Sequence, residues 1–345
     1  MDELHAWLTT WPAPLSISEH PAKNRMRAQQ GSRATNEPGH ALEALYADWR
    51  RTIDTAPDTP LADIRAMFEH WGDVTAEPAG VSYHEIEAGG RPALWAIPDN
   101  CAADRVLLCL HGGGYVLASM RSHRKLYGHI ARAVGCRALI PEYRRAPEHP
   151  HPAQVTDVVQ AYDWLLSSEG ISPEHVAFVG DSAGGALAIT ALLLARDRGM
   201  QLPAASVPIA PYVDTEALGA SYVTNATHDR LGARDATLAF MALFLGENGD
   251  RHDPLANPLR ADLRGLPPML VQVGGHDVLV DDSRQFHERA RAHGVDVILE
   301  IAPGQQHVFH FMAGSDQAAD AAIARIAAWL RPILTLAPGP GITAV

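Results

Sequence analysis

The stretch FVGDSAGGALA, residues 178–188, decides the fold. An apolar run ends at Gly180, and an alanine- and leucine-rich segment with helical spacing begins after Ser182. The residues from Gly180 to Gly184 match Gly-x-Ser-x-Gly, a pattern typical of a sharp turn from a strand into a helix. A side chain in place of either glycine would collide with neighbouring backbone. We therefore predict that Ser182 is a nucleophile at the carboxyl end of a parallel sheet, where ligands bind in open α/β folds.

The segments on both sides of this stretch alternate between strand and helix patterns. Gly89 and Gly90 predict a hairpin between the first two strands. The predicted strands are 81–88, 93–98, 105–110, 136–143, 175–180, 204–213, 268–274 and 295–301. The helices predicted among and after them are 122–135, 153–168, 183–199 and 317–331. Short β-branched runs that alternate with helices indicate a mostly parallel eight-stranded α/β sheet covered on both faces.

The beginning of the chain has a different pattern. Residues 1–80 show helical spacing at 41–53 and 61–71 and no strand alternation, so we expect an N-terminal helical cap segment. The first 30 residues have two open roles: they close this cap, or they exchange with a second subunit.

The remainder divides into three parts. Residues 81–335 are expected to form the catalytic domain, and an insertion at 212–262 adds to the cap. The insertion contains a predicted helix at 234–246, whose apolar residues we expect to be mostly core. The tail 336–345, rich in proline and glycine, is expected to be loosely ordered.

The composition restricts partners and location. The 345 residues carry a net charge of −12, which disfavours nucleic acid and anionic membranes as partners. Three cysteines do not form a disulfide framework, and Cys109 is expected in the core. No secretory signal or run of ~20 apolar residues is present. We expect a cytoplasmic protein without stable membrane insertion, a monomer or homodimer.

A serine nucleophile needs a base and a carboxylate that orients the base. In this kind of fold the chain order is serine, acid, histidine. Asp277 lies just past a predicted strand, and His307 lies in the loop after the last strand, so we predict these two as the partners of Ser182. The rival acids Asp281 and Asp282 sit in the first turn of a predicted helix, where acidic residues favour the helix dipole.

Two further features bear on this prediction. His310 lies three residues after His307 and remains an alternative base. The sequence HGGGY, residues 111–115, follows an apolar strand, at the place where such folds supply amide donors for a tetrahedral oxyanion. Its glycines let the backbone approach the substrate, and the amide of Ala183 completes the predicted oxyanion hole.

Together these motifs resemble the bacterial hormone-sensitive-lipase-like family of α/β-hydrolases. The resemblance covers about residues 80–332. It is carried, in fixed order, by HGGGY, PEYRRAPEHPHPA, GDSAGGALA, GHDVLVDD and HVF. It implies an α/β-hydrolase fold with a helical cap, carboxylesterase activity on short acyl chains, and no cofactor. It also implies Ser182, Asp277 and His307 as the triad, with oxyanion donors at Gly113, Gly114 and Ala183.

The chain departs from the family pattern at two places. Arg145 replaces an apolar residue, which leaves its packing partner open. The form His307-Val308-Phe309 resembles a branch that includes lactone hydrolases, so cyclic esters stay open as substrates. His149 and His151 suggest a metal pair, but the resemblance favours a structural loop, and we predict no metal.

Pocket residues are harder to predict. Tyr115, beside the oxyanion glycines, and Tyr212, at a strand end, are the candidates for substrate contact. Within the expected enzyme class, a small-molecule ester is the first substrate, and a lactone, an amide-cleaving reaction or acyl transfer share the same triad. A non-catalytic small-molecule receptor on this fold is the alternative of another class; such receptors typically lack the histidine base, which is present here as His307.

Overall fold

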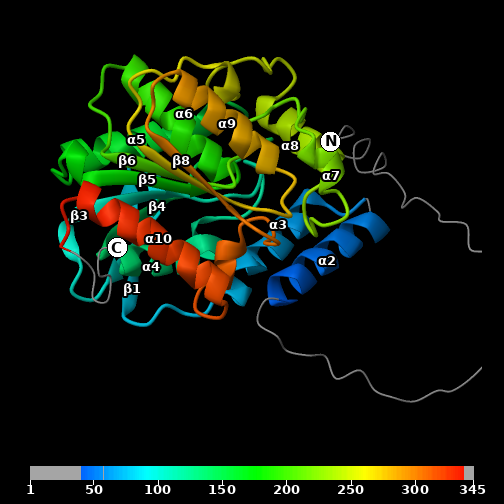
Figure 1. Cartoon of the computed structure of the whole chain (residues 1–345), viewed down its shortest axis with the longest axis horizontal. Coiled ribbons are helices and arrows are strands. Elements are labelled where there is room, and N and C mark those ends of the chain that lie inside the picture. Colours follow the sequence, from blue (N-terminus) through cyan, green and yellow to red (C-terminus); the bar gives the residue numbers. More distant parts are fainter. Residues whose placement is uncertain (1–39, 57, 338–345) are drawn as a thin grey trace, which may run out of the picture.

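The computed structural model describes residues 40–56 and 58–337, and their strands form one sheet in the order β1-β2-β4-β3-β5-β6-β7-β8 (Figure 1). The pairs β1–β2 and β2–β4 are antiparallel, and the other neighbours are parallel. The strands are β1 (Val81–Ala88), β2 (Arg91–Pro98), β3 (Ala102–Leu110), β4 (Cys136–Pro141), β5 (Val176–Asp181), β6 (Ala205–Ile209), β7 (Met269–Gly274) and β8 (Val297–Ala302). This confirms the predicted mostly parallel α/β sheet of eight strands.

Helices cover both faces of the sheet. α4 and α10 pack against each other on one face, and α5 and α6 pack together on the other, with α9 against β7 and β8 (Figure 1). The helices are α2 (His40–Thr55), α3 (Leu61–Glu69), α4 (Met120–Val134), α5 (Ala153–Ser167), α6 (Ala183–Asp197), α7 (Ser221–Thr224), α8 (Arg234–Leu245), α9 (Val280–Ala292) and α10 (Gln317–Ile333). The short 3-10 helices are η1 (His70–Val74), η2 (Pro173–His175), η3 (Pro258–Arg260) and η4 (Phe309–Met312).

The central strand β3 shows how the sheet separates two apolar cores. Leu108 and Leu110 point into the core shared with α5 and α6, whereas Leu107 and Cys109 point into the core shared with α4 and α10. Successive side chains of a strand face opposite sides, so a strand buried on both faces is apolar throughout. Cys109 is fully buried, as predicted.

The N-terminal helices pack onto the sheet through an aromatic cluster. Trp49 lies 4.3 Å from Phe68 between ring centroids, and Trp71 stacks on Phe311 at 4.8 Å. α2 and η1, the turn that follows α3, therefore lie beside η4, which follows the last strand. α3 ends two residues earlier than expected, because the chain tightens into η1 at Gly72, where a Cβ would lie 2.4 Å from the Ser122 carbonyl oxygen of α4.

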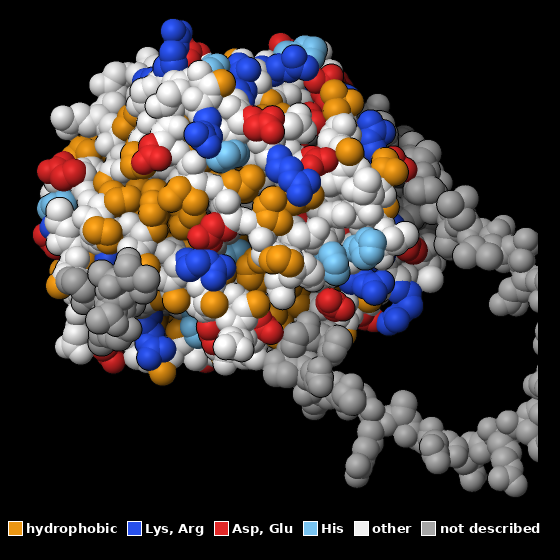
Figure 2. Space-filling view, viewed as in Figure 1, with side chains coloured by type: hydrophobic (Ala, Val, Ile, Leu, Met, Phe, Trp, Pro, Cys, Tyr) orange, Lys and Arg blue, Asp and Glu red, His pale blue; other side chains and the backbone are white. Residues whose placement is uncertain are grey.

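Strand β6 is shorter than the predicted 204–213. After Ile209 the chain turns away at Ala210, whose φ is 44°, and the Tyr212 amide donates to the Ser182 carbonyl instead of a neighbouring strand. The expected roles of the first 30 residues, and most of the expected tail, lie outside the described residues. Among the helices of residues 40–337 that are described, none is long and apolar enough to cross a bilayer. The face shown in Figure 2 carries acidic and basic side chains interspersed.

Candidate active site

Ser182 occupies the turn between β5 and α6. Its φ of 54° and ψ of −119° are a conformation that side chains rarely adopt. The turn is possible because a Cβ on Gly180 would lie 2.1 Å from the Gly184 carbonyl oxygen, and one on Gly184 would lie 1.9 Å from the Leu110 carbonyl oxygen. Such strain at a serine that begins a helix is typical of a reactive site, since the helix N-terminus favours negative charge.

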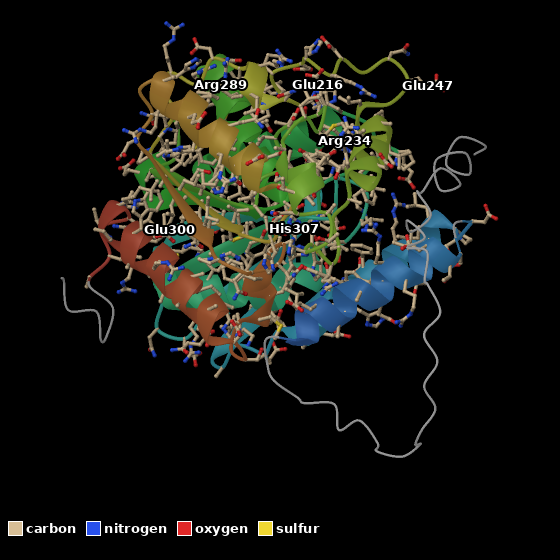
Figure 3. All side chains as sticks on the ribbon, turned by 45° about the vertical axis from the view of Figure 1, so that its right-hand side comes forward. Glu216, Arg234, Glu247, Arg289, Glu300 and His307 are labelled. Carbon is tan, nitrogen blue, oxygen red and sulfur yellow. The ribbon has the colours of Figure 1, made fainter. Side chains whose placement is uncertain are left out.

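His307 and Asp277 form a buried pair. The ring Nδ1 of His307 lies 2.7 Å from Asp277 Oδ2, and Asp277 Oδ1 accepts the Leu279 amide at 2.8 Å. The residues come from the loops after β8 and β7, which the parallel sheet brings together at its carboxyl edge. With Nδ1–H donating to the carboxylate, Nε2 is the ring atom left for a proton from a serine hydroxyl. Figure 3 shows His307 in the interior, while the labelled Arg289, Glu216 and Glu247 lie at the periphery.

Two effects compete on the pKa of His307. Burial lowers the pKa, and the charge and hydrogen bond of Asp277, with added charge from Asp229 and Asp181, raise it. Together the charges and the hydrogen bond outweigh the effect of burial, so the pKa of His307 lies above its ordinary value. An imidazole with a raised pKa accepts a proton more readily, which suits a general base that works at or above neutral pH.

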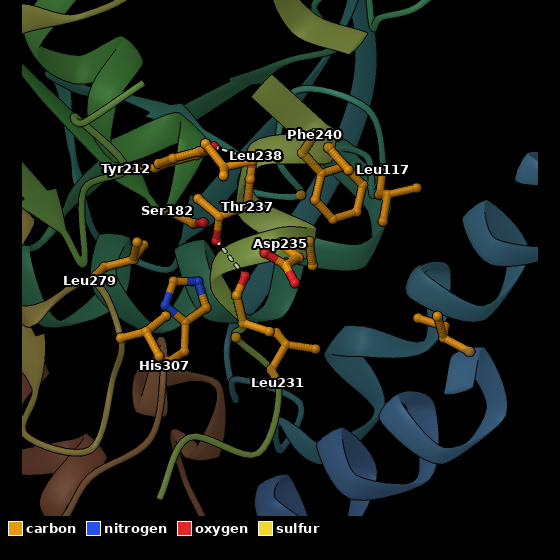
Figure 4. A pocket seen from close by; sticks show the side chains of 18 of the residues that line it. Leu117, Ser182, Tyr212, Leu231, Asp235, Thr237, Leu238, Phe240, Leu279 and His307 are labelled. Atoms are coloured by element: carbon orange, nitrogen blue, oxygen red, sulfur yellow. Dashed lines mark hydrogen bonds between the residues drawn. The ribbon is translucent and has the colours of Figure 1, made fainter. Parts of the chain in front are cut away.

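Ser182, Asp277 and His307 line one cavity of about 520 Å³. Figure 4 shows Ser182 and His307 on the same side of that cavity, with Phe240 and Leu117 on the opposite side. Most of the lining is apolar and comes from α2, α3, α8 and the strand ends. The structure therefore brings the three predicted triad residues to one cavity.

The glycine loop after β3 also reaches this cavity. Gly113 and Gly114 line it, with φ angles of 102° and 61°. A Cβ on Gly113 would lie 2.3 Å from the Leu117 carbonyl oxygen, and one on Gly114 would lie 3.0 Å from Cγ of Phe240. Among the hydrogen bonds of the described residues, the amides of Gly113, Gly114 and Ala183 have no acceptor. The glycine loop is therefore closely packed against its neighbours.

Side chains behind the loop hold it in place. The His111 ring stacks on Tyr143 at 4.1 Å between centroids, and the Tyr143 hydroxyl donates to the His111 carbonyl at 2.6 Å. Burial lowers the pKa of His111 to about 3, so this ring is neutral. The Gly112 amide lies 3.2 Å from Nε2 of His123, which is itself 3.2 Å from Asp181 Oδ2.

The rival residues lie elsewhere. Asp282 accepts the amides of Val213 and Asp214 from within α9, and Asp281 accepts the Ser221 amide. His310 is fully buried in η4, bonded through Nε2 to Gln272 Oε1 at 2.8 Å. Burial lowers the pKa of His310 to about 3, which makes it a poor base. Among the described residues, none of these three lines the cavity.

The two tyrosines have different positions. Tyr212 lines the cavity, and its hydroxyl donates to the Thr237 carbonyl oxygen (Figure 4). Tyr115 is 2% exposed and stacks on Phe244 at 3.7 Å between centroids. In the part of the chain that the structure describes, Tyr115 belongs to the apolar core and is not among the residues that line the cavity.

Helix α8 is less buried than expected. Met241 and Phe244 are core residues, but Leu238, Phe240 and Leu243 line the cavity. The helix is apolar on both sides, so helical spacing does not distinguish the wall of the cavity from the core.

Most of the other lining residues lie in the segments expected to form the cap, but the sequence singled out none of them. Asp229 and Leu231 precede α8, and Ile53, Ile64 and Phe68 come from the N-terminal helices. No local motif marks these residues, because long-range packing alone brings them to the cavity.

Two side chains that the sequence left open, Arg145 and His151, have contacts in the structure. The Arg145 guanidinium donates to the Ala118 carbonyl oxygen at 2.6 Å, which replaces the apolar packing expected at this position. His151 Nε2 lies 2.9 Å from Asp253 Oδ2, and its ring packs on Phe244. No group of metal-ligating side chains is present among the described residues.

A serine on a strand-to-helix turn, a histidine–aspartate pair on the following loops and this sheet order define an α/β-hydrolase. Residues 107–311 match the α/β-hydrolase fold family. The chain is 40% identical to an acetyl-hydrolase of Streptomyces hygroscopicus over 270 residues. These residues are 78% of this chain and 87% of the relative. An ethyl acetate hydrolase of Pseudomonas putida is 32% identical over 227 residues, covering 64% of this chain and 71% of the relative.

A solved structure narrows the family further. An esterase from the bacterial hormone-sensitive lipase family superposes with a TM-score of 0.83 and 41% identity, covering 87% of this chain and 99% of that chain. The chain therefore belongs to the hormone-sensitive-lipase-like family of α/β-hydrolases.

Proposed function

We propose that this chain hydrolyses short-chain carboxylic esters through an acyl-enzyme formed on Ser182. The enzyme class, a carboxylic ester hydrolase, rests on membership of the family and on the relatives named for ester hydrolysis. The observation that carries the mechanism is the single cavity lined by Ser182, the Asp277–His307 pair and the glycine loop.

Acylation uses each of these groups in turn. His307 Nε2 takes the proton of the Ser182 hydroxyl as Oγ attacks the ester carbonyl carbon. The oxyanion that forms accepts hydrogen bonds from the amides of Gly113, Gly114 and Ala183. The bond between carbon and the alcohol oxygen then breaks, and His307 returns the proton to the leaving alcohol.

Deacylation repeats the sequence with water. His307 takes a proton from a water molecule whose oxygen attacks the acyl carbon, and the same amides stabilise the second oxyanion. Collapse of this intermediate releases the carboxylic acid and restores the Ser182 hydroxyl with the proton from His307. Asp277 keeps Nδ1 protonated throughout, so that Nε2 stays available as the base.

The cavity supports a small substrate. It is about 520 Å³ with mostly apolar walls, and Phe240 approaches Gly114 so closely that it limits the space beside the oxyanion loop. The first two relatives above are named for the hydrolysis of acetyl groups and of ethyl acetate. α2, α3 and the 212–262 segment form the cap in this proposal, since their residues supply the outer walls.

The test is hydrolysis of p-nitrophenyl esters from acetyl to dodecanoyl by the native chain, by Ser182→Ala and by Ser168→Ala. Ser168 is exposed at the end of α5, so its variant controls for the loss of a serine hydroxyl. We expect turnover that peaks at short acyl chains, disappears in Ser182→Ala and persists in Ser168→Ala. Unchanged turnover in folded Ser182→Ala would reject the mechanism, and turnover of lactones but not open esters would reassign the substrate.

A further inference from the structure

Asp229 is a second buried carboxylate beside the triad, with no part in the steps above. It lies between α7 and α8, is 5% exposed and lines the same cavity as Ser182 and His307. Carboxylates are seldom buried unless their oxygens are paired or hydrogen-bonded. Its contacts therefore indicate what holds it there.

Backbone amides of two separate segments donate to Asp229. Oδ1 accepts the amides of Leu231 at 2.8 Å and Gly232 at 2.7 Å, in its own segment. Oδ2 accepts the amide of Val278 at 2.9 Å, next to the acid of the triad. Three amide donors favour the ionised carboxylate. Asp229 thus joins the segment before α8 to the loop that carries Asp277.

Two neighbouring amide side chains fasten the same segment. Asn225 Nδ2 donates to the carbonyl oxygens of Gly275 and Asp277, at 3.0 and 2.8 Å. Gln306 Oε1 accepts the Arg230 amide at 2.9 Å, and Nε2 donates to the His228 carbonyl at 3.0 Å. Residues 225–232, which we call the strap, are therefore bound to the loops of both Asp277 and His307.

Charged and titratable groups face His307 from every element around it. They are Asp277 after β7, Asp229 in the strap, Asp181 at the end of β5 and Tyr46 on α2. Arg50 and Asp235 line the same cavity, but neither is among the groups whose charge shifts the pKa of His307. Burial, and then repulsion from Asp277, raise the pKa of Asp229, while His307 and the bound amides lower it; the net effect is a raised pKa. Asp229 and His307 thus interact electrostatically, and each stabilises the charged form of the other.

We propose that Asp229 is a positioning residue for the Asp277–His307 pair. Its carboxylate holds the loop of Asp277 in place and stabilises the imidazolium that forms when His307 takes the proton of Ser182. The strap thereby couples the wall of the substrate cavity to the base. This inference rests on the proposed esterase mechanism.

The test is the pH profile of kcat/KM in Asp229→Asn, with Asp235→Asn as the matched control. Asp235 lines the same cavity but is exposed on α8, so it controls for the loss of an acidic side chain from the wall. The acid limb of this profile is the range in which kcat/KM falls as pH decreases. In Asp229→Asn we expect the acid limb to move to lower pH by about half a unit or more, because an opposite charge that favours the imidazolium is lost. kcat and kcat/KM should fall together at the plateau, as for an interaction made only in the transition state. In Asp235→Asn the acid limb should not move.

A purely structural role would lower the yield of active protein without moving the limb, and an unmoved limb in folded Asp229→Asn overturns the proposal. If Asp229→Asn does not fold, Asp229→Ser is the second variant, since a hydroxyl oxygen still accepts one amide. Failure of both to fold would assign Asp229 to stability alone and also overturn the proposal.

A measurement without turnover separates this inference from the proposed function. In the Ser182→Ala background, the downfield Nδ1–H proton of the His307–Asp277 pair reports the titration of the ring by NMR. We expect this titration to move to lower pH when Asp229→Asn is added. Absence of ester hydrolysis in the native chain would reject the esterase mechanism, and an unmoved NMR titration would reject the role of Asp229.

Discussion

Two histidine–aspartate pairs lie beside the Ser182 turn, and they differ in what the second ring nitrogen does. His307 uses Nδ1 for Asp277 at 2.7 Å, and its ring borders the cavity. His123 uses Nε2 for Asp181 at 3.2 Å and Nδ1 for the Ser122 hydroxyl at 2.9 Å, and both members of this pair are fully buried. A hydrogen-bonded histidine–carboxylate pair is therefore not sufficient for a base. The base also needs a ring nitrogen that faces the substrate.

The inner pair has a different task. The Gly112 amide and Asp181 Oδ2 both lie 3.2 Å from Nε2 of His123, so the ring connects the glycine loop to the turn before Ser182. Burial raises the pKa of Asp181, but the charge of His123 and hydrogen bonds from His123 and Tyr127 lower it below its ordinary value. We therefore expect the inner pair to fix the scaffold of the site, while in the proposed mechanism the outer pair moves the proton.

The largest expected effect separates the two histidines. His307→Gln should reduce kcat/KM by about 10⁴-fold or more, because the proton of Ser182 has no acceptor, while the fold is kept. His123→Gln should keep kcat/KM within about 100-fold and lower the free energy of unfolding by about 1–3 kcal/mol, because buried polar groups lose partners. Ester kinetics and denaturant unfolding measure both quantities. The reverse order of the two rate losses would exchange the roles assigned here.

The next largest difference is expected between variants of the two carboxylates, Asp277 and Asp181. Asp277→Asn should lower kcat by about 10³- to 10⁴-fold, since an amide favours the wrong tautomer of His307. Asp181→Asn should mainly lower stability. Because the pKa of Asp181 is lowered in the folded chain, its contribution is present above the unfolded value and is lost as pH falls through the folded value. In Asp181→Asn the free energy of unfolding, measured at several acidic pH values, should depend less on pH than in the native chain. An unchanged pH dependence would contradict this account.

The sequence predicted which motif residues meet at the cavity better than it predicted the walls of the cavity. Ser182 and the glycine loop follow from short motifs, because a strained turn between close backbones admits few residues. Asp277 and His307 follow from their places after strands, since parallel strands bring these loops to one edge. The inner pair was not predicted, because His123 lies within a helix whose pattern is that of any amphipathic helix.

The cavity walls were predicted poorly for a related reason. Phe240 and Phe244 are four residues apart on α8, yet one faces the cavity and the other packs on Tyr115. Which face of an apolar helix is covered depends on distant segments and not on its own sequence. Tyr115 lies in the core for the same reason, since it packs on the distant Phe244. Asp229 was missed because its contact with the loop of Asp277, through the Val278 amide, spans about fifty residues of sequence.

The pH dependence sharpens the comparison between the pairs. Because the pKa of His307 is raised, kcat/KM should decline as pH falls through a value above 6.5, where the base becomes protonated. The same shift stabilises the fold below the unfolded pKa of the ring, and this contribution is lost as pH rises through the folded pKa. The stability contribution of the outer pair therefore changes with pH above 6.5, between the unfolded and folded pKa of His307, whereas the contribution of Asp181 changes only in acid. A pH–rate profile whose acid limb lies below 6.5 would contradict the raised pKa.

The smallest effects are expected from two tyrosines, each of which is hydrogen-bonded to one of the histidine–aspartate pairs. The Tyr46 hydroxyl of α2 donates to the His307 carbonyl at 2.9 Å and accepts from Trp71 Nε1 at 3.0 Å. Tyr46→Phe should cost about 1–2 kcal/mol of stability, since the indole N–H and the carbonyl lose their partner. It should also lower kcat a few-fold, because the backbone of the base is less firmly held.

Tyr127 is the matched residue on the inner pair, with its hydroxyl 2.5 Å from Asp181 Oδ1 and from the Leu110 carbonyl oxygen. Tyr127→Phe should cost a similar free energy of unfolding and leave the acid limb of kcat/KM in place, because the ring of His307 keeps its environment. Thermal unfolding and kinetics on one short ester compare the two variants. If Tyr127→Phe lowered kcat more than Tyr46→Phe at equal stability, the inner pair would take part in the chemistry, and the division between scaffold and base would fail.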